Sequence, residues 1–378
     1  MRTKRILTML GLAAAAACFL SCSSLGTAQS ALVREYEWLG KGGGFQEWGQ
    51  TANGGLFGLS VNPELLETWQ WHGSELIRDT MGIMPRVMHV NVIAGGKYVA
   101  LTSPGNKYTS WPLVLAKTQP QEELRRWPPP AHWRFTRVGL RRDGKMLAVF
   151  LEENLANPPN DYDSSRWRYR IGLANPELGE IRWVAELAGH GAGTIERIAV
   201  ADDGAYVAIV GWNNGIVMVE SATGAILWKG RPQEVVSMGD GVFSSDSSVL
   251  YAADAGGGCV YVLETKTGNV IRKMTASTTG RSEYGHRISC LATSPDGKWL
   301  AAGTGPEGQV FLFRANGEGK PIVFPHGLIT TLIVSFSPDS RYLASAAGGR
   351  IKVWSINAVA GASEAATSAA STQESGER

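Results

Sequence analysis

The sequence predicts an all-β fold in which seven four-stranded antiparallel units close into a ring. A glycine-type turn flanked by alternating apolar residues recurs seven times at similar spacing. The 46 glycines and 13 tryptophans among 378 residues are typical of short strands joined by tight turns, and long apolar stripes with helical spacing are few. Hydrophobic residues make up 44% of the chain and charged residues 19%, which indicates a folded protein with a large core.

The first 30 residues have the layout of an export signal. A basic start leads into the apolar stretch Ile6–Leu20 and then into small polar residues. Gly26-Thr27-Ala28 fits ordinary signal cleavage. The alternative, Phe19-Leu20-Ser21-Cys22, resembles a bacterial lipoprotein box with Phe in place of the usual Leu. We expect the second cleavage, with lipidation of the cysteine; a simple export signal with an incidental cysteine is the other interpretation.

The lipoprotein interpretation divides the start of the chain into a signal peptide, 1–21, and a tether, 22–30, that begins at the lipidated Cys22. It predicts a protein of the bacterial cell envelope, lipid-anchored in the periplasm or at the outer membrane, or a soluble periplasmic protein if the cysteine is not modified. No second run of eighteen apolar residues follows. The mature chain is therefore expected to have no transmembrane segment and to contact the membrane only through its lipid.

The charge balance argues against nucleic acid as a partner. Without the signal peptide the chain has 33 Lys and Arg against 34 Asp and Glu. A nucleic-acid binder needs a basic surface to neutralise phosphates, so a strongly basic binder is excluded.

Two cysteines remain in the mature body, Cys259 and Cys290. An exported protein is free to form a disulfide. Each cysteine lies inside an apolar, strand-like run, however, which favours buried free thiols over a bridge.

The seven copies align on the turn between their first and second strands. That turn needs a residue that tolerates positive φ, which Gly does freely and Asn, Asp or Ser can support through local hydrogen bonds. Successive turn residues are 42, 48, 60, 43, 50 and 43 positions apart, close to the roughly 40–50 residues of a four-stranded propeller blade. They are Gly54, Gly96, Gly144, Gly204, Ser247, Gly297 and Ser340.

A single copy cannot bury both faces of its sheet, so the copies must stack, and a ring leaves no long edges. The last copy ends at Trp354–Asn357 after only three strands. The tail 358–378 has 13 Ala, Ser or Thr among 21 residues and is predicted to be disordered. We therefore predict a seven-bladed β-propeller over residues 31–357 whose last blade is completed by the N-terminal strand Ala31–Leu39.

The last two copies carry a family resemblance. SPDGKWLAAG, SPDSRYLASAAGGRIKVW and the pairs Gly189-His190 and Gly285-His286 resemble WD-repeat propellers, over roughly 31–357 and most strongly from 189 onward. The Trp-Asp pair that ends such a blade is replaced by Trp354-Ser355 in the last copy and by Phe313-Arg314 in the sixth. The hydrogen-bonded tetrad of that family is therefore expected to be mostly incomplete, as in a divergent bacterial propeller.

A second motif is similar to the docking motif of pyrroloquinoline-quinone-type propellers. Thr223-Gly224-x-x-x-Trp228 has this motif, and Gly179-x-x-x-Trp183 has its Gly and Trp at the same spacing. The resemblance implies that the tryptophan wedges between blades, a packing role whether or not a quinone is present.

Motifs for catalysis are missing from the mature chain. There is no Gly-x-Ser-x-Gly elbow, phosphate loop, His-Glu-x-x-His or Cys-x-x-Cys, and the quinoprotein resemblance would imply adjacent cysteines that the chain lacks. GHGAGT at 189–194 opens a strand and lacks the last glycine of a dinucleotide loop. We predict no cofactor and lean against an enzyme.

No metal site is predicted either. Four histidines precede first strands and would share one face of the ring, namely His132, His190, His286 and His326. Ring symmetry spaces such residues apart, so a structural role within each blade is favoured over metal binding. The acidic loop 152–163 lacks the alternating ligands of a calcium loop and is interpreted as a solvated insertion.

The loops that enter first strands and those that join second to third strands share one face of a propeller, and this face carries the candidate binding residues. Aromatic and arginine side chains anchor interfaces, and a long loop on a rigid ring is often functional. The candidates are Trp127, His132, Trp133, Arg134, Tyr162, Trp212, Arg281, Tyr284 and Arg287. The tryptophans are also candidates for plugging grooves between blades.

The sequence favours a non-catalytic, envelope-anchored propeller that binds a protein or a polymer through this face. One alternative is a scaffold resembling the lipoprotein propeller of the outer-membrane assembly machinery, although seven copies differ from the eight of that family. Another is a propeller enzyme of the lactonase or quinoprotein type, against which the missing catalytic residues argue.

Overall fold

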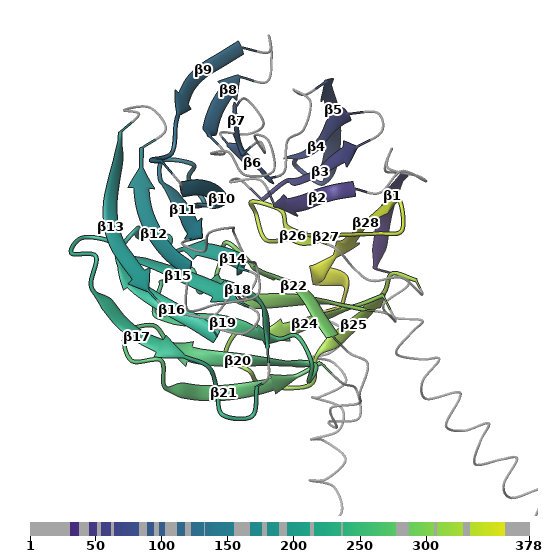
Figure 1. Ribbon diagram of the computed structural model, residues 1–378. Coiled ribbons are helices and arrows are strands. Elements are labelled where there is room, and N and C mark those ends of the chain that lie inside the picture. Colours follow the sequence, from purple (N-terminus) through teal and green to yellow (C-terminus); the bar gives the residue numbers. More distant parts are fainter. Residues whose placement is uncertain are drawn as a thin grey trace, which may run out of the picture.

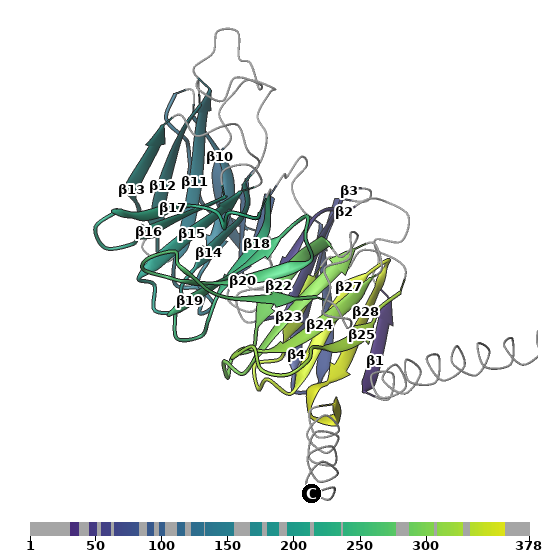
Figure 2. The ribbon, with the colours of Figure 1, turned by 90° about the horizontal axis from the view of Figure 1, so that it is seen from below.

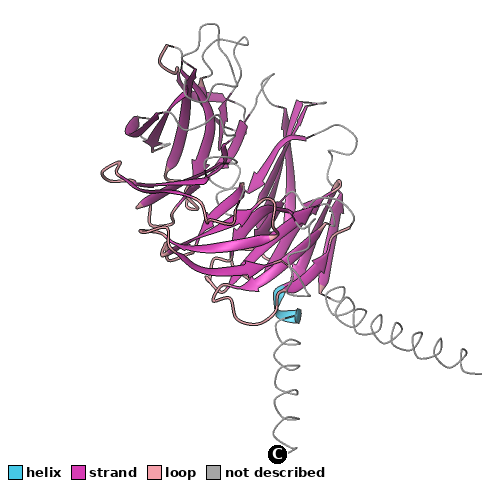
Figure 3. Ribbon diagram, turned by 60° about the horizontal axis from the view of Figure 1, so that its bottom comes forward, coloured by secondary structure: helices cyan, strands magenta, loops and turns pink. Residues whose placement is uncertain are grey.

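The computed structural model describes most of the body of the chain. The described residues are 31–37, 45–50, 54–61, 64–82, 89–93, 98–102, 112–117, 122–131, 133–154, 167–175, 180–188, 195–211, 215–235, 237–276, 287–305, 308–327 and 333–359. These are almost entirely strands, with one short helical turn at 356–359 (Figure 3). No helix in this described part is long and apolar enough to cross a membrane.

Seven four-stranded antiparallel sheets surround a common centre (Figure 1). Blade 1 holds β2 (Phe45–Gln50), β3 (Leu56–Val61), β4 (Glu64–His72) and β5 (Glu75–Gly82); blade 2 holds β6 (His89–Ile93), β7 (Tyr98–Thr102), β8 (Leu113–Lys117) and β9 (Glu122–Trp127). Blade 3 holds β10 (Trp133–Leu140), β11 (Leu147–Asn154), β12 (Trp167–Ala174) and β13 (Ile181–Ala188); blade 4 holds β14 (Ile195–Val200), β15 (Tyr206–Gly211), β16 (Gly215–Glu220) and β17 (Ile226–Gly230). Blade 5 holds β18 (Met238–Phe243), β19 (Val249–Asp254), β20 (Cys259–Glu264) and β21 (Val270–Thr275); blade 6 holds β22 (Arg287–Thr293), β23 (Trp299–Gly305), β24 (Gln309–Arg314) and β25 (Ile322–Pro325). Blade 7 holds β26 (Ile333–Phe336), β27 (Tyr342–Ala347), β28 (Arg350–Ser355) and β1 (Leu32–Glu37).

The first strand of each blade contacts the first strand of the next, and β2 contacts β26, so the ring closes. The predicted all-β, seven-bladed propeller is therefore confirmed. Its core lies between blades: each apolar cluster combines residues of adjacent sheets, as Val217 of blade 4 does with Ile171 of blade 3.

The N-terminal strand completes the last blade, as predicted. β1 pairs antiparallel with β28 and brings Glu35 opposite Lys352. Ala31 is buried with Trp354 in the core of blades 6 and 7. The other side of the strand reaches blade 1, where the Tyr36 hydroxyl accepts a hydrogen bond from the backbone N–H of Leu76. This strand thus joins the two ends of the ring.

The turn chemistry predicted for the repeats is confirmed at every turn that the structure describes. Positive φ values occur at Gly54, Gly144, Gly204, Ser247, Gly297 and Ser340; Gly96 lies outside the described residues. The two serines have φ near +60° and also bond to the preceding blade. Ser340 Oγ accepts from the Asp296 N–H at 3.0 Å, so the turns of blades 6 and 7 are linked to each other.

The predicted docking role of Trp228 is also found. Its indole Nε1 donates to Thr265 O in the next blade at 2.7 Å. Gly268 of that blade, at φ +73°, lies against the same ring, and a Cβ there would come within 2.7 Å of it. The tryptophan of one blade therefore supports the outer turn of the next.

Blade 7 contains a buried hydrogen-bonded chain of three side chains. His326 Nδ1 lies 2.8 Å from Ser345 Oγ, which in turn accepts from Trp354 Nε1 at 2.9 Å. Burial lowers the pKa of His326 to about 4, so the imidazole is neutral at neutral pH. For this histidine the predicted structural role is found; the other three candidates lie outside the described residues.

Cys259 and Cys290 are buried free thiols, which is the interpretation that the sequence favoured over a disulfide. The helical turn after β28 adds Ile356 and Val359 to the core of blades 6 and 7, so the packed body extends to residue 359. Cys22, Gly179 and the rest of the tail lie outside the described residues.

Candidate interaction face

The two ends of the ring differ because the strands alternate in direction. The turns that join first to second strands lie at one end, which we call the hairpin face. The connections from second to third strands, and from one blade to the next, lie at the other, which we call the loop face. Links between the Asp203 N–H and Ser247 Oγ, and between Asp296 and Ser340, run along the hairpin face from blade to blade.

The hairpin end of the central channel is crossed by side chains. Arg142 Nη2 of blade 3 donates to Thr293 Oγ1 of blade 6 at 2.9 Å. Gln50 Nε2 of blade 1 donates to Leu291 O and Val334 O of blades 6 and 7. These contacts thus join non-adjacent blades at the hairpin end of the ring.

Blade 3 extends above the ring at the loop face (Figure 2). Its four strands have eight residues each, whereas those of blade 4 have five or six. Trp133 begins β10, is only 5% exposed, and packs under two arginines of β12: the guanidinium of Arg170 is 4.6 Å from the ring centroid and that of Arg168 is 6.0 Å. The blade end is thus an aromatic side chain covered by cations.

Carboxylates balance these cations across neighbouring strands. Arg134 Nε contacts Glu152 Oε1 at 2.7 Å, and Arg170 Nε contacts Glu186 Oε2 at 3.0 Å. Arg168 contacts Glu153 at 2.6 Å. The projecting end of blade 3 therefore presents equal numbers of arginines and glutamates in fixed geometry.

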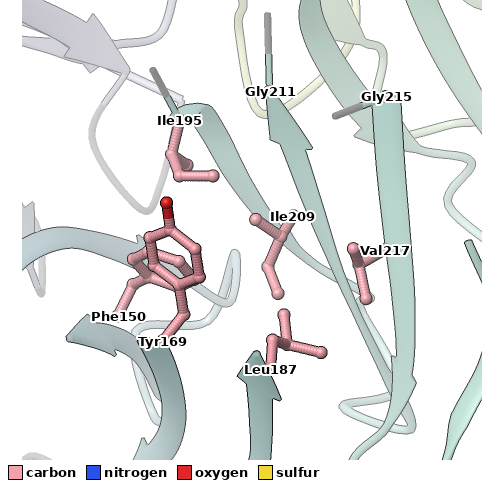
Figure 4. Close-up of a pocket in the computed structure, with 8 residues that line it drawn as sticks. All are labelled: Phe150, Tyr169, Leu187, Ile195, Ile209, Gly211, Gly215 and Val217. Carbon is pink, nitrogen blue, oxygen red and sulfur yellow. The ribbon is translucent and has the colours of Figure 1, made fainter. Parts of the chain in front are cut away.

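An apolar depression lies beside this end, between blades 3 and 4 (Figure 4). Its volume is about 310 Å³ including the solvent at its opening. It is lined by Phe150, Tyr169, Leu187, Ile195, Ile209, Gly211, Gly215 and Val217. The phenol oxygen of Tyr169 is the polar side-chain atom of this lining, and burial, with the nearby Glu152, raises the pKa of Tyr169 to about 12. The phenol therefore stays protonated at neutral pH.

The first strands of five blades share a β-bulge at the same position. β2, β10, β14, β18 and β22 each shift register near their loop-face end, as a β-bulge does. A bulge leaves one residue unpaired and re-aims its side chain. The skipped residues are Gln46, Thr136, Glu196, Gly239 and Ser289, so Glu196 is the one charged residue among these five.

Charged side chains surround Glu196. Burial raises its pKa, the positive charges of Arg137 and Arg287 oppose that shift, and the charge of Asp240 adds to it. Arg197, on the same strand, approaches Asp240 Oδ1 at 3.5 Å. Blades 3 to 6 thus contribute a group of three arginines and two carboxylates on the inner strands.

Four of the nine candidate binding residues lie in the described part of the chain. Trp127 ends β9 half-buried, with the guanidinium of Arg125 5.9 Å from its ring. Trp133 is buried in the core between blades 2 and 3, as a groove-filling tryptophan would be. Arg134 pairs with Glu152 on the other face of the sheet, toward blade 4, and Arg287 begins β22 at the channel. The candidates that lie outside the described residues are His132, Tyr162, Trp212, Arg281 and Tyr284.

The sequence did not reveal Tyr169, Arg137 or Glu196. Each lies inside a strand and belongs to no motif. The alternation of side chains along a strand says only which face of the sheet the residue is on. The bulge at Glu196 follows from pairing with β15, which local sequence does not report. Within the described ranges, no three His, Cys, Asp or Glu residues are grouped closely enough to hold a metal ion.

Comparison with known proteins supports the propeller and narrows the family resemblance to its last part. The family model described as WD domain, G-beta repeat matches residues 277–314 and 321–355. These segments cover blades 6 and 7, and the second begins one strand early, at β25. WD-type repeats are thus present in the last two blades.

One curated relative and one solved structure illustrate the likeness. The small ribosomal subunit protein RACK1 of Caenorhabditis elegans is 36% identical over 69 residues, which is 18% of this chain and 21% of that protein. The matched segment is therefore about a fifth of the relative. A chain in the crystal structure of a mitotic checkpoint complex superposes with a TM-score of 0.63 at 15% identity and covers 86% of this chain and 92% of that one. The second likeness is one of fold alone.

Proposed function

We propose that this β-propeller is a non-catalytic scaffold that binds a protein or polymer partner on its loop face. The observation that carries the proposal is the projecting end of blade 3. Arg134 lies on the side of the apolar depression that faces blade 4, and Arg170 covers the buried Trp133 on the opposite side of the same sheet. Interfaces are anchored by aromatic and arginine side chains next to small apolar pockets. WD-type propellers, which blades 6 and 7 resemble, typically act as protein-binding scaffolds.

The chemistry of the blade 3 end supports binding over catalysis. Its arginines are paired with glutamates, so their charges are already balanced. Burial raises the pKa of Tyr169 to about 12, so its phenol stays protonated and does not act as a base. Rigid, paired groups of this kind fix the orientation of a partner without providing a nucleophile or a base.

We also propose that the scaffold is held at the bacterial cell envelope by a lipid on Cys22, with the tether 22–30 between lipid and ring. The motif Phe19-Leu20-Ser21-Cys22 supports this location. Mass spectrometry of the mature protein tests it: a diacylated cysteine at the N-terminus is expected. An unmodified chain that begins at Gln29 would contradict anchoring and favour a soluble exported protein.

Site-specific photocrosslinking in cells tests the binding face. A photoreactive residue at Glu186, on the projecting blade, is compared with the same residue at Lys298, whose side chain is 76% exposed on the hairpin face. We expect a discrete crosslinked species from the first position, reduced when Arg170→Ala or Arg134→Ala is added. Crosslinks from Lys298 alone, or no species from either position, would refute the proposed face.

A further inference from the structure

The apolar depression between blades 3 and 4 lies where two glycines of blade 4 face each other. In the ladder of β15 and β16, Ile209 pairs with Val217, and Gly211 pairs with Gly215 two residues further toward the loop face. Residues two apart on a strand share one face of the sheet. The first pair therefore packs its side chains against blade 3, whereas the second pair has no side chains to fill the space beside it (Figure 4).

Blade 3 brings one buried polar group to this depression. Tyr169 is 4% exposed, and its ring stacks on Phe150 with the centroids 5.3 Å apart. Its hydroxyl points into the depression, toward Ile195 (Figure 4). In the part of the chain that the structure describes, this hydroxyl makes no hydrogen bond. Buried hydroxyl groups are normally bonded, so an unbonded one that faces an open space indicates a place for a ligand.

The neighbours of Tyr169 in its own sheet do not supply an acceptor. On one side it is opposite Glu152, whose Oε1 accepts from Arg134 Nε at 2.7 Å. On the other side it is opposite Leu187, whose side chain has no acceptor. Burial, together with the charge of Glu152, raises the pKa of Tyr169 to about 12, so the phenol is protonated at neutral pH and able to donate. A bound partner can supply the acceptor.

The charges around the depression favour an uncharged occupant. The lining has no ionised group, because Tyr169 is protonated and the other seven lining residues are apolar or glycine. Beside it, Arg134 and Glu152 balance each other as an ion pair. The volume of about 310 Å³ includes solvent at the opening, whereas pockets that enclose whole small molecules have roughly 300–1,000 Å³. The enclosed part therefore suits a single aliphatic side chain.

From these observations we propose that the depression receives one leucine-like side chain of the partner, and that the Tyr169 hydroxyl donates to a backbone carbonyl of the same partner segment. The inference rests on the proposed loop-face function and names the residue type that anchors the partner. An apolar anchor in a pocket, next to polar groups that exclude water, is typical of the residues that hold an interface. The buried donor adds specificity, since an occupant without a carbonyl nearby leaves it unbonded.

Methyl NMR with N-acetyl-leucine methylamide tests the site directly. This probe has one aliphatic side chain and two carbonyl groups, and the matched probes are its alanine and lysine counterparts. The δ1-methyl groups of Ile195 and Ile209 report from the depression, and that of Ile351, buried between blades 7 and 1, is the internal control. We expect the leucine probe to shift the first two signals alone, with a dissociation constant of about 1 mM for so small a ligand. The alanine probe should bind about tenfold more weakly or less, and the lysine probe should not bind.

Two variants of the lining separate the role of the space from that of the hydroxyl. Val217→Phe fills the depression from blade 4 and should abolish binding of the leucine probe. Tyr169→Phe keeps the ring and removes the donor, so it should weaken binding by about threefold to tenfold. The same variant should leave the thermal midpoint of the free protein unchanged or higher, because the hydroxyl is unbonded there.

Val270→Phe is the control variant. It makes the same substitution at a side chain that is 49% exposed on β21, and it should bind the leucine probe like the unchanged protein. Circular dichroism establishes that each variant is folded. If Val217→Phe does not fold, Tyr169→Phe and the alanine probe still decide the matter.

The outcomes separate this inference from the proposed function. No shift at Ile195 and Ile209, equal binding of the leucine and alanine probes, or a lower thermal midpoint of Tyr169→Phe would each overturn the anchor site. The first result is also the one expected if a residue of this chain already fills the depression. A crosslink from Glu186 that persists in Val217→Phe leaves the loop-face scaffold standing without this anchor. Probe binding without any crosslink supports the depression as a site and counts against the proposed partner face.

Discussion

Arg142 and Thr293 are 151 residues apart in the chain, yet the guanidinium Nη2 of the first donates a 2.9 Å hydrogen bond to the hydroxyl of the second. Arg142 also lies 3.5 Å from Asp202 of blade 4, and Thr293 Oγ1 donates to Phe243 O of blade 5. One side chain of blade 3 thereby connects three further blades across the hairpin end of the channel.

Arg142→Ala is expected to lower the free energy of unfolding by about 2 kcal/mol, because it removes one charge-assisted bond and leaves the half-buried Asp202 without this cation. Urea unfolding followed by tryptophan fluorescence measures the change. Arg341→Ala, whose side chain is 69% exposed, serves as the control and should change stability by less than about 0.5 kcal/mol. Equal effects of the two variants would contradict a tie across the channel.

The sequence alone predicts the number of blades and the strand that closes the ring, because both follow from the repeat turns and the alternating strands. Ser247 and Ser340 replace glycine at the repeat turn and still adopt positive φ, so alignment on that turn counted the blades correctly. The N-terminal strand was found because the last copy lacks a partner for β28. These features follow from local patterns and from the need to cover every sheet edge.

Apart from Arg287, the charged residues on the inner strands of blades 3 to 6 were not predicted as a site, and neither was the depression at Tyr169, for a different physical reason. Both depend on how neighbouring blades approach each other. Arg137 bonds Ile195 O in the next blade, and Glu196 is re-aimed by a bulge that is defined only by pairing with β15. Local periodicity describes one sheet at a time, so sites made between sheets remain invisible until the ring is assembled.

His326 makes the stability of the ring depend on pH. It is 7% exposed and burial lowers its pKa to about 4, whereas an unfolded histidine titrates near 6.5. Between pH 6.5 and pH 4 the unfolded chain binds a proton at this histidine and the folded chain does not. The contribution of neutral His326 to the stability of the folded state is therefore complete above pH 6.5 and is lost as the pH falls toward 4. The full loss is about 3 kcal/mol, at 1.36 kcal/mol per pKa unit.

The free energy of unfolding, measured with denaturant at about pH 7.5, 5.5 and 4.5, checks this pH dependence across the titration of His326. His326→Gln is expected to be less stable at the highest pH, because Ser345 loses its imidazole partner, and to approach the unchanged protein as the pH falls. A difference between the two proteins that stays constant over the range would mean that His326 does not titrate in this window.

Gly268 and Gly73 offer a matched test of blade docking. Both have positive φ, +73° and +62°, so alanine costs about 1 kcal/mol of backbone strain at either position. At Gly73 a Cβ meets nothing within 4 Å, whereas at Gly268 it comes within 2.7 Å of the Trp228 ring. Gly268→Ala should therefore cost about 1–3 kcal/mol more than Gly73→Ala, as overpacking does. Equal midpoints in urea would show that Trp228 moves aside freely.

Cys290 is expected to be chemically inert in the folded protein. Burial raises the pKa of its thiol to about 12, so almost no thiolate, the reactive form, exists at neutral pH. Iodoacetamide labelling followed by mass spectrometry should leave Cys259 and Cys290 unmodified under native conditions and modify both in guanidinium, since both are buried. Lys298→Cys on the hairpin face gives the reference rate for an exposed thiol. Native labelling of Cys290 at that rate would contradict the burial seen in blade 6.

Strand β1 is expected to hold the ring closed. A chain that begins at Gly40 lacks the five β1 residues that pair with β28 and the buried Ala31, and should lose about 4 kcal/mol or more relative to a chain that begins at Ala31. The exposed β28 edge should also promote association, which analytical ultracentrifugation detects. Adding the peptide ALVREYEWL, which has the sequence of residues 31–39, should restore stability in proportion to its concentration, whereas a scrambled peptide should not. If the shortened chain is as stable as the longer one, and monomeric, the closure of the ring does not depend on this strand.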